Sequence, residues 1–193
     1  MIDIAMKVIT HQLNRYMHQR FELDEDVVVL STPFDADGGI ASQVSNKLVV
    51  FLANLTKDTV PYTSTQHAPA SGAGSSFASS VPLYLNLHVI VGSCFDAARY
   101  PESLKYLSHA VRCFQVNSVI DKETHPALDE TVEKLILDIE NIGIHDLGNL
   151  WGIQGGKYIP SILYRVRMVS FANDDIQSRD ITASTPQTSA ATQ

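Results

Sequence analysis

The clearest structural signal in this 193-residue chain is the segment Pro82-Leu83-Tyr84-Leu85-Asn86-Leu87-His88-Val89-Ile90-Val91. Leucine or valine stands at every second position from Leu83 to Val91, with Tyr84, Asn86 and His88 among the residues between them. Because successive side chains of a strand point to opposite faces of a sheet, this alternation predicts a strand with one clearly buried face. We therefore expect a fold organised around a β-sheet.

Four more segments predict strands. Residues 27–30 are apolar, and residues 47–55 are apolar on both faces, as expected of a central strand covered from two sides. Residues 132–142 place Leu135, Leu137 and Ile139 on one face. The last predicted strand, residues 162–168, alternates apolar residues with two arginines, namely Ile162, Tyr164, Val166 and Met168 with Arg165 and Arg167.

Three segments predict helices. Residues 3–20 are amphipathic, with a polar side of Lys7, His11, Arg15 and Gln19. A second helix begins at Pro101, a residue that suits the first helical position. Its expected buried stripe is Leu104, Leu107, Val111 and Phe114. A short helix covers residues 144–151 and stops at Gly152, with Ile144, Leu147 and Leu150 in its apolar stripe.

The strands outnumber the helices, and some connections are too short to hold a crossover helix. This favours an α+β fold, a mixed and largely antiparallel sheet with helices packed on it, over a doubly wound parallel sheet. Residues 1–173 are expected to form one domain. Within it, residues 58–80 have no period and predict a long flexible loop, and residues 174–193 predict a low-complexity tail.

Charge and composition exclude several classes of function. The chain carries 14 Lys and Arg against 21 Asp and Glu, a net charge of −7, which argues against a dominant nucleic-acid surface and leaves room only for a local basic patch. No stretch approaches the roughly 20 apolar residues of a membrane span, and charged residues interrupt the N-terminal segment where a signal peptide would be apolar. We expect synthesis in the cytoplasm, no membrane partner, and Cys94 and Cys113 as reduced core thiols.

Two glycine-containing segments imitate ligand-binding motifs. The segment Gly152-Ile153-Gln154-Gly155-Gly156-Lys157-Tyr158 resembles a phosphate loop, but Trp151 replaces its first glycine and Tyr158 the magnesium-binding Ser or Thr. A turn between helix and strand is the better interpretation.

Asp35-Ala36-Asp37-Gly38 resembles the opening of a calcium loop, but the glycine comes too early and Asn46 replaces the closing glutamate. This favours an Asx-type turn.

The chain shows no local signature of catalysis. Its seven histidines are scattered, and His88 and His109 fall on the predicted polar sides of their strand and helix. The pair His11 and His18 lies seven residues apart on the first helix without a third ligand nearby. A nucleophile elbow is also missing. We therefore predict no catalytic residue, no metal site and no cofactor.

Four sets of segments occur in order along residues 1–172. They are Ile2–Ala5 with Leu13–Tyr16; Val29–Ser31 and Asp35–Gly38 with Asn46–Val49; Pro82–Leu87 and Ser103–Ser108 with Phe114-Gln115; and Leu147–Gly152 and Lys157–Ser161 with Tyr164–Arg167. Taken together they resemble the cap, or tail terminator, proteins of phage-tail-like contractile injection systems of the antifeeding-prophage type.

The resemblance implies a tail-terminator-like domain that forms a hexameric ring of identical copies. Such a ring lies at the end of the particle distal to the baseplate and terminates polymerisation of the inner tube and the sheath. It implies tube and sheath subunits as partners and no enzymatic activity. Because residues 58–80 are polar and without a period, we separately hypothesise that this loop contacts tube or sheath. Two alternatives stay open: another tail component, such as a tube-completion or sheath-associated subunit, and a small anion- or nucleotide-binding domain that uses the turn at residues 152–157.

The residues expected near a ring interface are Trp151, Lys157, Tyr158, Arg165 and Arg167. Trp and Tyr are enriched at protein interfaces. Trp151 also extends the apolar stripe of the predicted short helix, and a core position is the stronger expectation for it.

Overall fold

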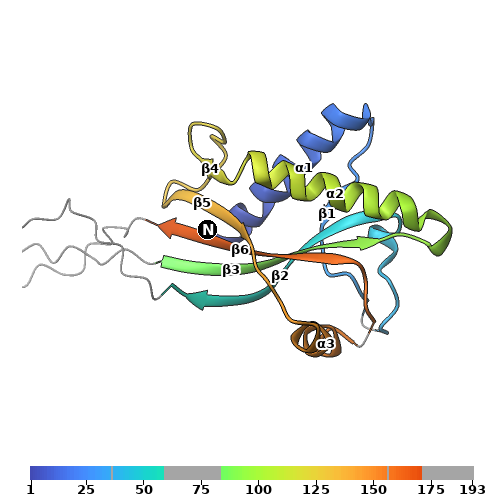
Figure 1. Cartoon of the computed structure of the whole chain (residues 1–193). Coiled ribbons are helices and arrows are strands. Elements are labelled where there is room, and N and C mark those ends of the chain that lie inside the picture. The colour runs from blue at the N-terminus through green and yellow to red at the C-terminus, as the bar shows by residue number, and fades with distance from the viewer. Residues whose placement is uncertain (36, 59–83, 156, 171–193) are drawn as a thin grey trace, which may run out of the picture.

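A computed structural model describes residues 1–35, 37–58, 84–155 and 157–170 of the chain (Figure 1). Its helices are α1 (Ile2–Phe21), α2 (Tyr100–Val116) and α3 (Ile144–Ile153). Its strands are β1 (Val28–Leu30), β2 (Lys47–Lys57), β3 (Tyr84–Cys94), β4 (Val119–Asp121), β5 (Val132–Ile139) and β6 (Ser161–Ser170). Two single turns of 3-10 helix lie at Ser42–Val44 and Ala97–Arg99.

The six strands form one mixed sheet in the order β1-β2-β3-β6-β5-β4. Only β1 and β2 run parallel, and every other neighbouring pair is antiparallel. The alternating segment identified in the sequence is β3, which pairs with β2 on one side and β6 on the other. The predicted α+β class with a largely antiparallel sheet is confirmed.

The main core lies between the sheet and the two long helices. Both α1 and α2 cover the upper face of the sheet in Figure 1, whereas α3 lies below it. The alternation in β3 and β6 directs Leu87, Val89, Tyr164 and Val166 into this core, as predicted. The helices contribute further fully buried side chains, among them Leu13, Met17, Cys113 and Phe114.

A smaller second core lies on the opposite face, under α3. It joins side chains of β2 and β3 to the loops that flank them, namely Ala41, Val44, Val49, Phe51, Ile90, Cys94, Trp151 and Ile159. Gly92 of β3 leaves the space that Ile159 occupies, because a Cβ there would lie 2.7 Å from Ile159 Cδ1. Both cysteines are buried and free, and burial raises the pKa of Cys94 to about 11 and that of Cys113 to about 12.

The buried stripe of α2 differs from the prediction. Leu104 is 42% exposed and Val111 is half-buried, whereas the buried residues are Ser103, Tyr106, Leu107, Ala110, Cys113 and Phe114. This stripe lies one residue around the helix from the predicted one and keeps Leu107 and Phe114. His109 lies at its edge, 4.7 Å from the Phe21 ring between centroids, rather than on a fully solvated side.

Three smaller expectations are corrected. The two-sided burial of β2 holds for residues 48–51 but ends at Leu52, because α3 covers only part of the second face. Ile139 is exposed at the end of β5. Helix α3 does not stop at Gly152 as predicted but continues to Ile153. Strand β4 was not predicted, because three residues are too few to show a period. The predicted 58–80 loop and 174–193 tail lie outside the described residues, except Asp58.

Asn14 of α1 fixes the edge strand β1 to the helix layer. Its buried side-chain amide donates to the Val28 carbonyl at 2.7 Å and its Oδ1 accepts from the Val28 N–H at 2.9 Å. The amide thereby replaces a missing strand neighbour and satisfies two backbone groups at the sheet edge. The chain between α1 and β1 is consequently held at both of its ends.

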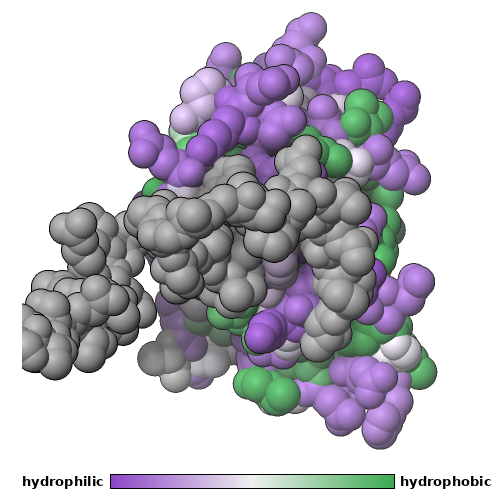
Figure 2. Space-filling view, turned by 90° about the vertical axis from the view of Figure 1, so that its left-hand side faces the viewer, coloured by the Kyte–Doolittle hydropathy of each residue, from purple (hydrophilic) through white to green (hydrophobic). Residues whose placement is uncertain are grey.

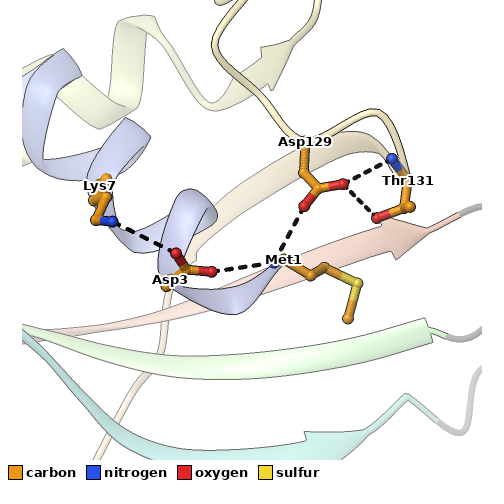
Figure 3. A network of polar contacts seen from close by, with 5 residues as sticks. All are labelled: Met1, Asp3, Lys7, Asp129 and Thr131. Atoms are coloured by element: carbon orange, nitrogen blue, oxygen red, sulfur yellow. Dashed lines mark hydrogen bonds and ion pairs between the residues drawn. The ribbon is translucent and has the colours of Figure 1, made fainter.

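A polar network joins the start of α1 to the loop before β5 (Figure 3). The Met1 amino group lies 3.1 Å from a carboxylate oxygen of Asp3 and 3.1 Å from one of Asp129. Asp129 Oδ1 also accepts from the Thr131 N–H and hydroxyl at 2.9 and 2.7 Å. These two bonds and the Met1 ammonium lower the pKa of Asp129 from 3.8 to about 2.

The lowered pKa predicts an acid-dependent contribution of Asp129 to stability. A carboxyl whose pKa is depressed in the folded state stabilises the fold above its unfolded value of 3.8, and this stabilisation is lost as the pH falls toward about 2. Asp129→Asn should therefore unfold at lower urea concentration than the wild type at pH 6, and the difference should narrow steadily below pH 4. A gap in urea midpoint that stays constant over this pH range would contradict the assignment.

Candidate interface around helix α3

Helix α3 rests on the second face of the sheet through a single fully buried side chain. Trp151 is 3% exposed, Leu147 and Leu150 are half-buried, and the other residues of the helix are exposed. The helix follows Gly143 and ends at Ile153, so that its ten residues make fewer than three turns. A helix this short is held by its packing rather than by its own propensity.

Trp151 is the centre of an aromatic cluster that joins four parts of the chain. Its ring lies 6.3 Å from Phe34, 6.4 Å from Phe51 and 5.9 Å from Tyr158 between centroids, each in an edge-to-face arrangement. Phe51 belongs to β2, Phe34 to the loop after β1, and Tyr158 to the connection into β6. Trp151 is therefore a core residue, which agrees with the stronger of the two sequence-based expectations.

The turn at residues 35–39 is closed by hydrogen bonds and held by a lysine. The Gly38 N–H donates to the Asp35 carbonyl at 2.9 Å, and the Gly39 N–H donates to Asp37 Oδ1 at 2.9 Å. The second bond confirms the predicted Asx-type turn. Lys157 Nζ then donates to the Gly38 carbonyl at 2.6 Å, and Gly38 has a φ of +77° that favours glycine.

The segment that resembles a phosphate loop is a turn, as predicted. The helix ends at Ile153, Gly155 has a φ of +97°, and the chain then leads into β6. The lysine that a phosphate loop would direct at its ligand bonds a backbone carbonyl of the 35–39 turn instead. The residues therefore connect α3 to the turn and to the sheet.

Four exposed apolar side chains lie on α3 and its neighbouring loops. We define the α3 surface by Ile40 (47% exposed), Ile144 (85%), Ile153 (84%) and Tyr158 (61%). Figure 2 shows hydrophobic residues at the lower edge of the molecule, the level at which Figure 1 places α3. Apolar side chains grouped in this way are more informative than scattered ones, because they mark surfaces that are covered in an assembly.

Ile144 and Ile153 were not expected in this position. The sequence placed Ile144 in the buried stripe with Leu147 and Leu150, but it lies in the first turn of α3, beyond the edge of the second core. Ile153 is in the last turn and points away from Trp151, two residues earlier. The sequence feature that indicated this exposure is the shortness of the helix, since a helix of ten residues that is anchored by one buried tryptophan leaves both of its ends exposed.

Arg165 and Arg167 lie apart from the α3 surface, on the polar half of the same sheet face. Arg165 Nε is 3.4 Å from Glu140 Oε2, and Arg167 Nε is 2.9 Å from Asp58 Oδ2. In the ladder they stand opposite His88 and Asn86 of β3. The five predicted interface residues thus divide into a core anchor (Trp151), two residues beside α3 (Lys157 and Tyr158) and two paired arginines.

The described part of the chain offers neither a metal site nor a membrane span. Within it, no three histidine, cysteine, aspartate or glutamate side chains gather closely enough to hold a metal ion. The described helices also include none with the length and apolar run that crossing a bilayer requires.

The fold class and the arrangement around α3 are those of a small α+β domain with an apolar outer helix. The sequence profile of the family described as "Pvc16 N-terminal domain" matches residues 6–183. The chain therefore belongs to this family, and the resemblance to tail terminators seen in the sequence is confirmed at the level of the family. No curated protein sequence matches the chain significantly.

Two solved structures resemble the chain at low sequence identity. One is the sheath/tube terminator of an extracellular contractile injection system, PVC, in its extended state, with 15% identity and a TM-score of 0.46 over 95% of this chain. The other is the tube-terminating cap of the anti-feeding prophage, with 13% identity and a TM-score of 0.45 over 96% of this chain. The chain spans 65% and 60% of the length of these two proteins.

The cluster predicts losses of stability of very different size for two contacting aromatic residues, Trp151 and Tyr158. Trp151→Ala removes a buried ring and leaves a cavity, which should lower the free energy of unfolding by about 3–5 kcal/mol. Tyr158→Ala removes a mostly exposed ring and one edge-to-face contact, and should cost about 1 kcal/mol or less. Urea unfolding of both variants measures the difference, and equal losses would show that Trp151 is not the anchor of α3.

Proposed function

We propose that the chain is a structural cap of a contractile injection system, a ring at the distal end of the particle that terminates polymerisation of the inner tube and the sheath. The observation that carries the proposal is the family match over residues 6–183. The two solved structures that the chain resembles are a sheath/tube terminator and a tube-terminating cap, which agrees with this role.

The proposed mechanism depends on shape alone. A tube or sheath grows because each layer presents a surface that accepts the next layer. A contact between two different patches of identical copies closes into a ring when its rotation allows closure. A hexameric ring that matches the last layer on one side and offers no docking surface on the other ends growth. We infer that no catalytic step is required.

We place one protein contact of the cap on the α3 surface. Ile144 and Ile153 are almost fully exposed, and burying each in an interface would contribute about 1.5–3 kcal/mol. In this proposal Lys157 and Tyr158 border the contact, and Trp151 holds α3 in place from the core. Arg165 and Arg167, on the polar half of the same sheet face, are proposed as a second, charged contact.

The proposal predicts the lengths of particles made without the protein. Deletion of the gene should yield tubes and sheaths of long and variable length in electron micrographs, and the wild-type gene should restore a uniform length. Complementation with Ile144→Glu/Ile153→Glu should fail, because two charges would have to be buried in the contact.

A matched variant separates this effect from a general effect of added charge. Leu104→Glu/Val116→Glu changes two exposed apolar residues of α2, on the other side of the sheet, and should restore uniform length. Uniform particles from the deletion strain itself would rule out the capping role. Full complementation by the α3 variant would instead remove the α3 surface from the contact.

A further inference from the structure

The helix layer carries a charge opposite to that of the chain as a whole. Across α1 and α2 there are five basic residues, Lys7, Arg15, Arg20, Lys105 and Arg112, against only Asp3 and Glu102. The whole chain has a net charge of −7. Glu102 is already paired with Arg99 at 2.7 Å. The local basic patch that the composition left open therefore lies on the outer helices.

Part of this patch surrounds a cleft between α1 and the loop after β4. The cleft has a volume of about 360 Å³ and an apolar floor with basic side chains at its rim. Its lining residues are Ile4, Lys7, Val8, His11, Arg15, Thr124, His125, Pro126 and Ala127.

A buried histidine fixes the direction of the Arg15 side chain. His125 is 6% exposed, and its Nε2 lies 2.8 Å from Gln12 Oε1, which also accepts from Arg15 Nη2 at 2.6 Å. Burial, and after it the charges of Arg15 and His11, lower the pKa of His125. The histidine is consequently neutral at neutral pH and serves as a support, while Arg15 supplies the charge.

Two of the three basic side chains of the cleft, His11 and Arg15, have no acidic partner among the described residues. Among the described residues, no ion pair involves Arg15 or His11, and Lys7 contacts only the exposed Asp3 at 3.5 Å. The carboxylate of Asp121, three residues before Thr124, accepts hydrogen bonds from the Thr124 N–H and hydroxyl. A positive rim over an apolar floor is complementary to an acidic segment that contains an apolar residue.

The chain itself exposes a segment of this kind. Between α1 and β1 it reads Glu22-Leu23-Asp24-Glu25-Asp26, and its four acidic residues are exposed. One pair is found there, His18 with Asp26 at 2.9 Å. The segment follows the C-terminus of α1, where the helix dipole disfavours negative charge, so its composition does not serve the helix that it ends.

The basic cleft and the acidic segment occupy successive parts of α1 and its C-terminal extension. A helix of 20 residues is about 30 Å long, and the cleft extends along it from Ile4 to Arg15, whereas the segment follows its last turn. Figure 1 shows α1 rising from the N-terminus over the sheet to a far end, from which the chain descends to β1. Within one copy, no ion pair among the described residues joins the segment to Lys7, His11 or Arg15, so one copy carries both halves of a head-to-tail contact and leaves both unused.

We propose that the cleft beside α1 receives the Glu22–Asp26 segment of a second copy of this chain. The contact is heterologous, so repetition around an axis closes a ring, and the inference rests on the ring of the proposed function. Asn14, which holds Val28 just after the segment, fixes the position from which the segment is presented. A segment fixed in advance loses less conformational freedom on binding.

Charge reversal of each half tests the contact in the full-length chain. His11→Glu/Arg15→Glu reverses the cleft, and Asp24→Lys/Glu25→Lys reverses the segment without touching the His18–Asp26 pair. Each variant should raise the dissociation constant of ring assembly about tenfold or more, measured by sedimentation velocity at low salt. Arg112→Glu and Asp138→Lys make charge changes of the same sign outside the contact and should assemble like the wild type.

Mixing the variants distinguishes a direct contact from a loss of folding. A cleft-reversed copy and a segment-reversed copy are complementary at both of their junctions, so an equal mixture should form rings that neither forms alone. The variant with all four substitutions should also assemble. Failure of both rescues, with circular dichroism showing folded variants, would overturn the proposal.

The remaining outcomes separate this inference from the capping role. Reversed variants that assemble like the wild type, or a wild-type chain that stays monomeric but still restores uniform particles, would overturn the contact and leave the cap standing. Binding of a fluorescent oligonucleotide that is lost in the cleft-reversed variant, with rings unchanged, would assign the cleft to nucleic acid and also overturn it.

Discussion

The burial of β3 on both faces is the constraint on which the rest of the structure depends. Leu87, Val89 and Val91 point into the main core under α1 and α2, and Ile90 and Cys94 point into the second core. Each fully buried apolar side chain contributes at most about 1.5–3 kcal/mol, and β3 places five of them within eight residues. The strand therefore joins the two layers that carry the proposed contacts.

Helices cover the two faces of the sheet to different extents, and this difference decides which apolar side chains stay exposed. Two long helices cover the first face, whereas one short helix, anchored by Trp151, covers part of the second. The ends of α3 consequently project as exposed isoleucines. On the opposite side, α1 extends across the helix layer with a basic cleft along residues 4–15 and an acidic segment after its end.

The sequence predicted most of the fold because its elements have strong periods. The alternation of β3 and β6 and the polar side of α1 were read correctly, since each reflects one buried face. The stripe of α2 was misplaced by one residue, because Leu104 and Val111 fit helical spacing as well as Ser103 and Ala110 do, and only contact with β3 and α1 decides between them. The three-residue strand β4 offers no period to read.

The candidate sites were less accessible to sequence reasoning. The apolar stripe of the predicted short helix indicated the core position of Trp151. The exposure of Ile144 could not be predicted in this way, because it depends on where α3 crosses the sheet. The cleft joins His11 and Arg15 to His125, residues more than 100 positions apart, through a hydrogen bond between Gln12 and a buried histidine. Nothing in the spacing of the seven histidines indicated this contact.

The proposed function requires one ring of this chain at the end of an assembled particle. Gold-labelled antibody against the chain, imaged on intact particles by electron microscopy, locates the chain in the particle. Label is expected at a single end of each particle, opposite the baseplate. Label along the sheath, at the baseplate, or absent from intact particles would contradict it.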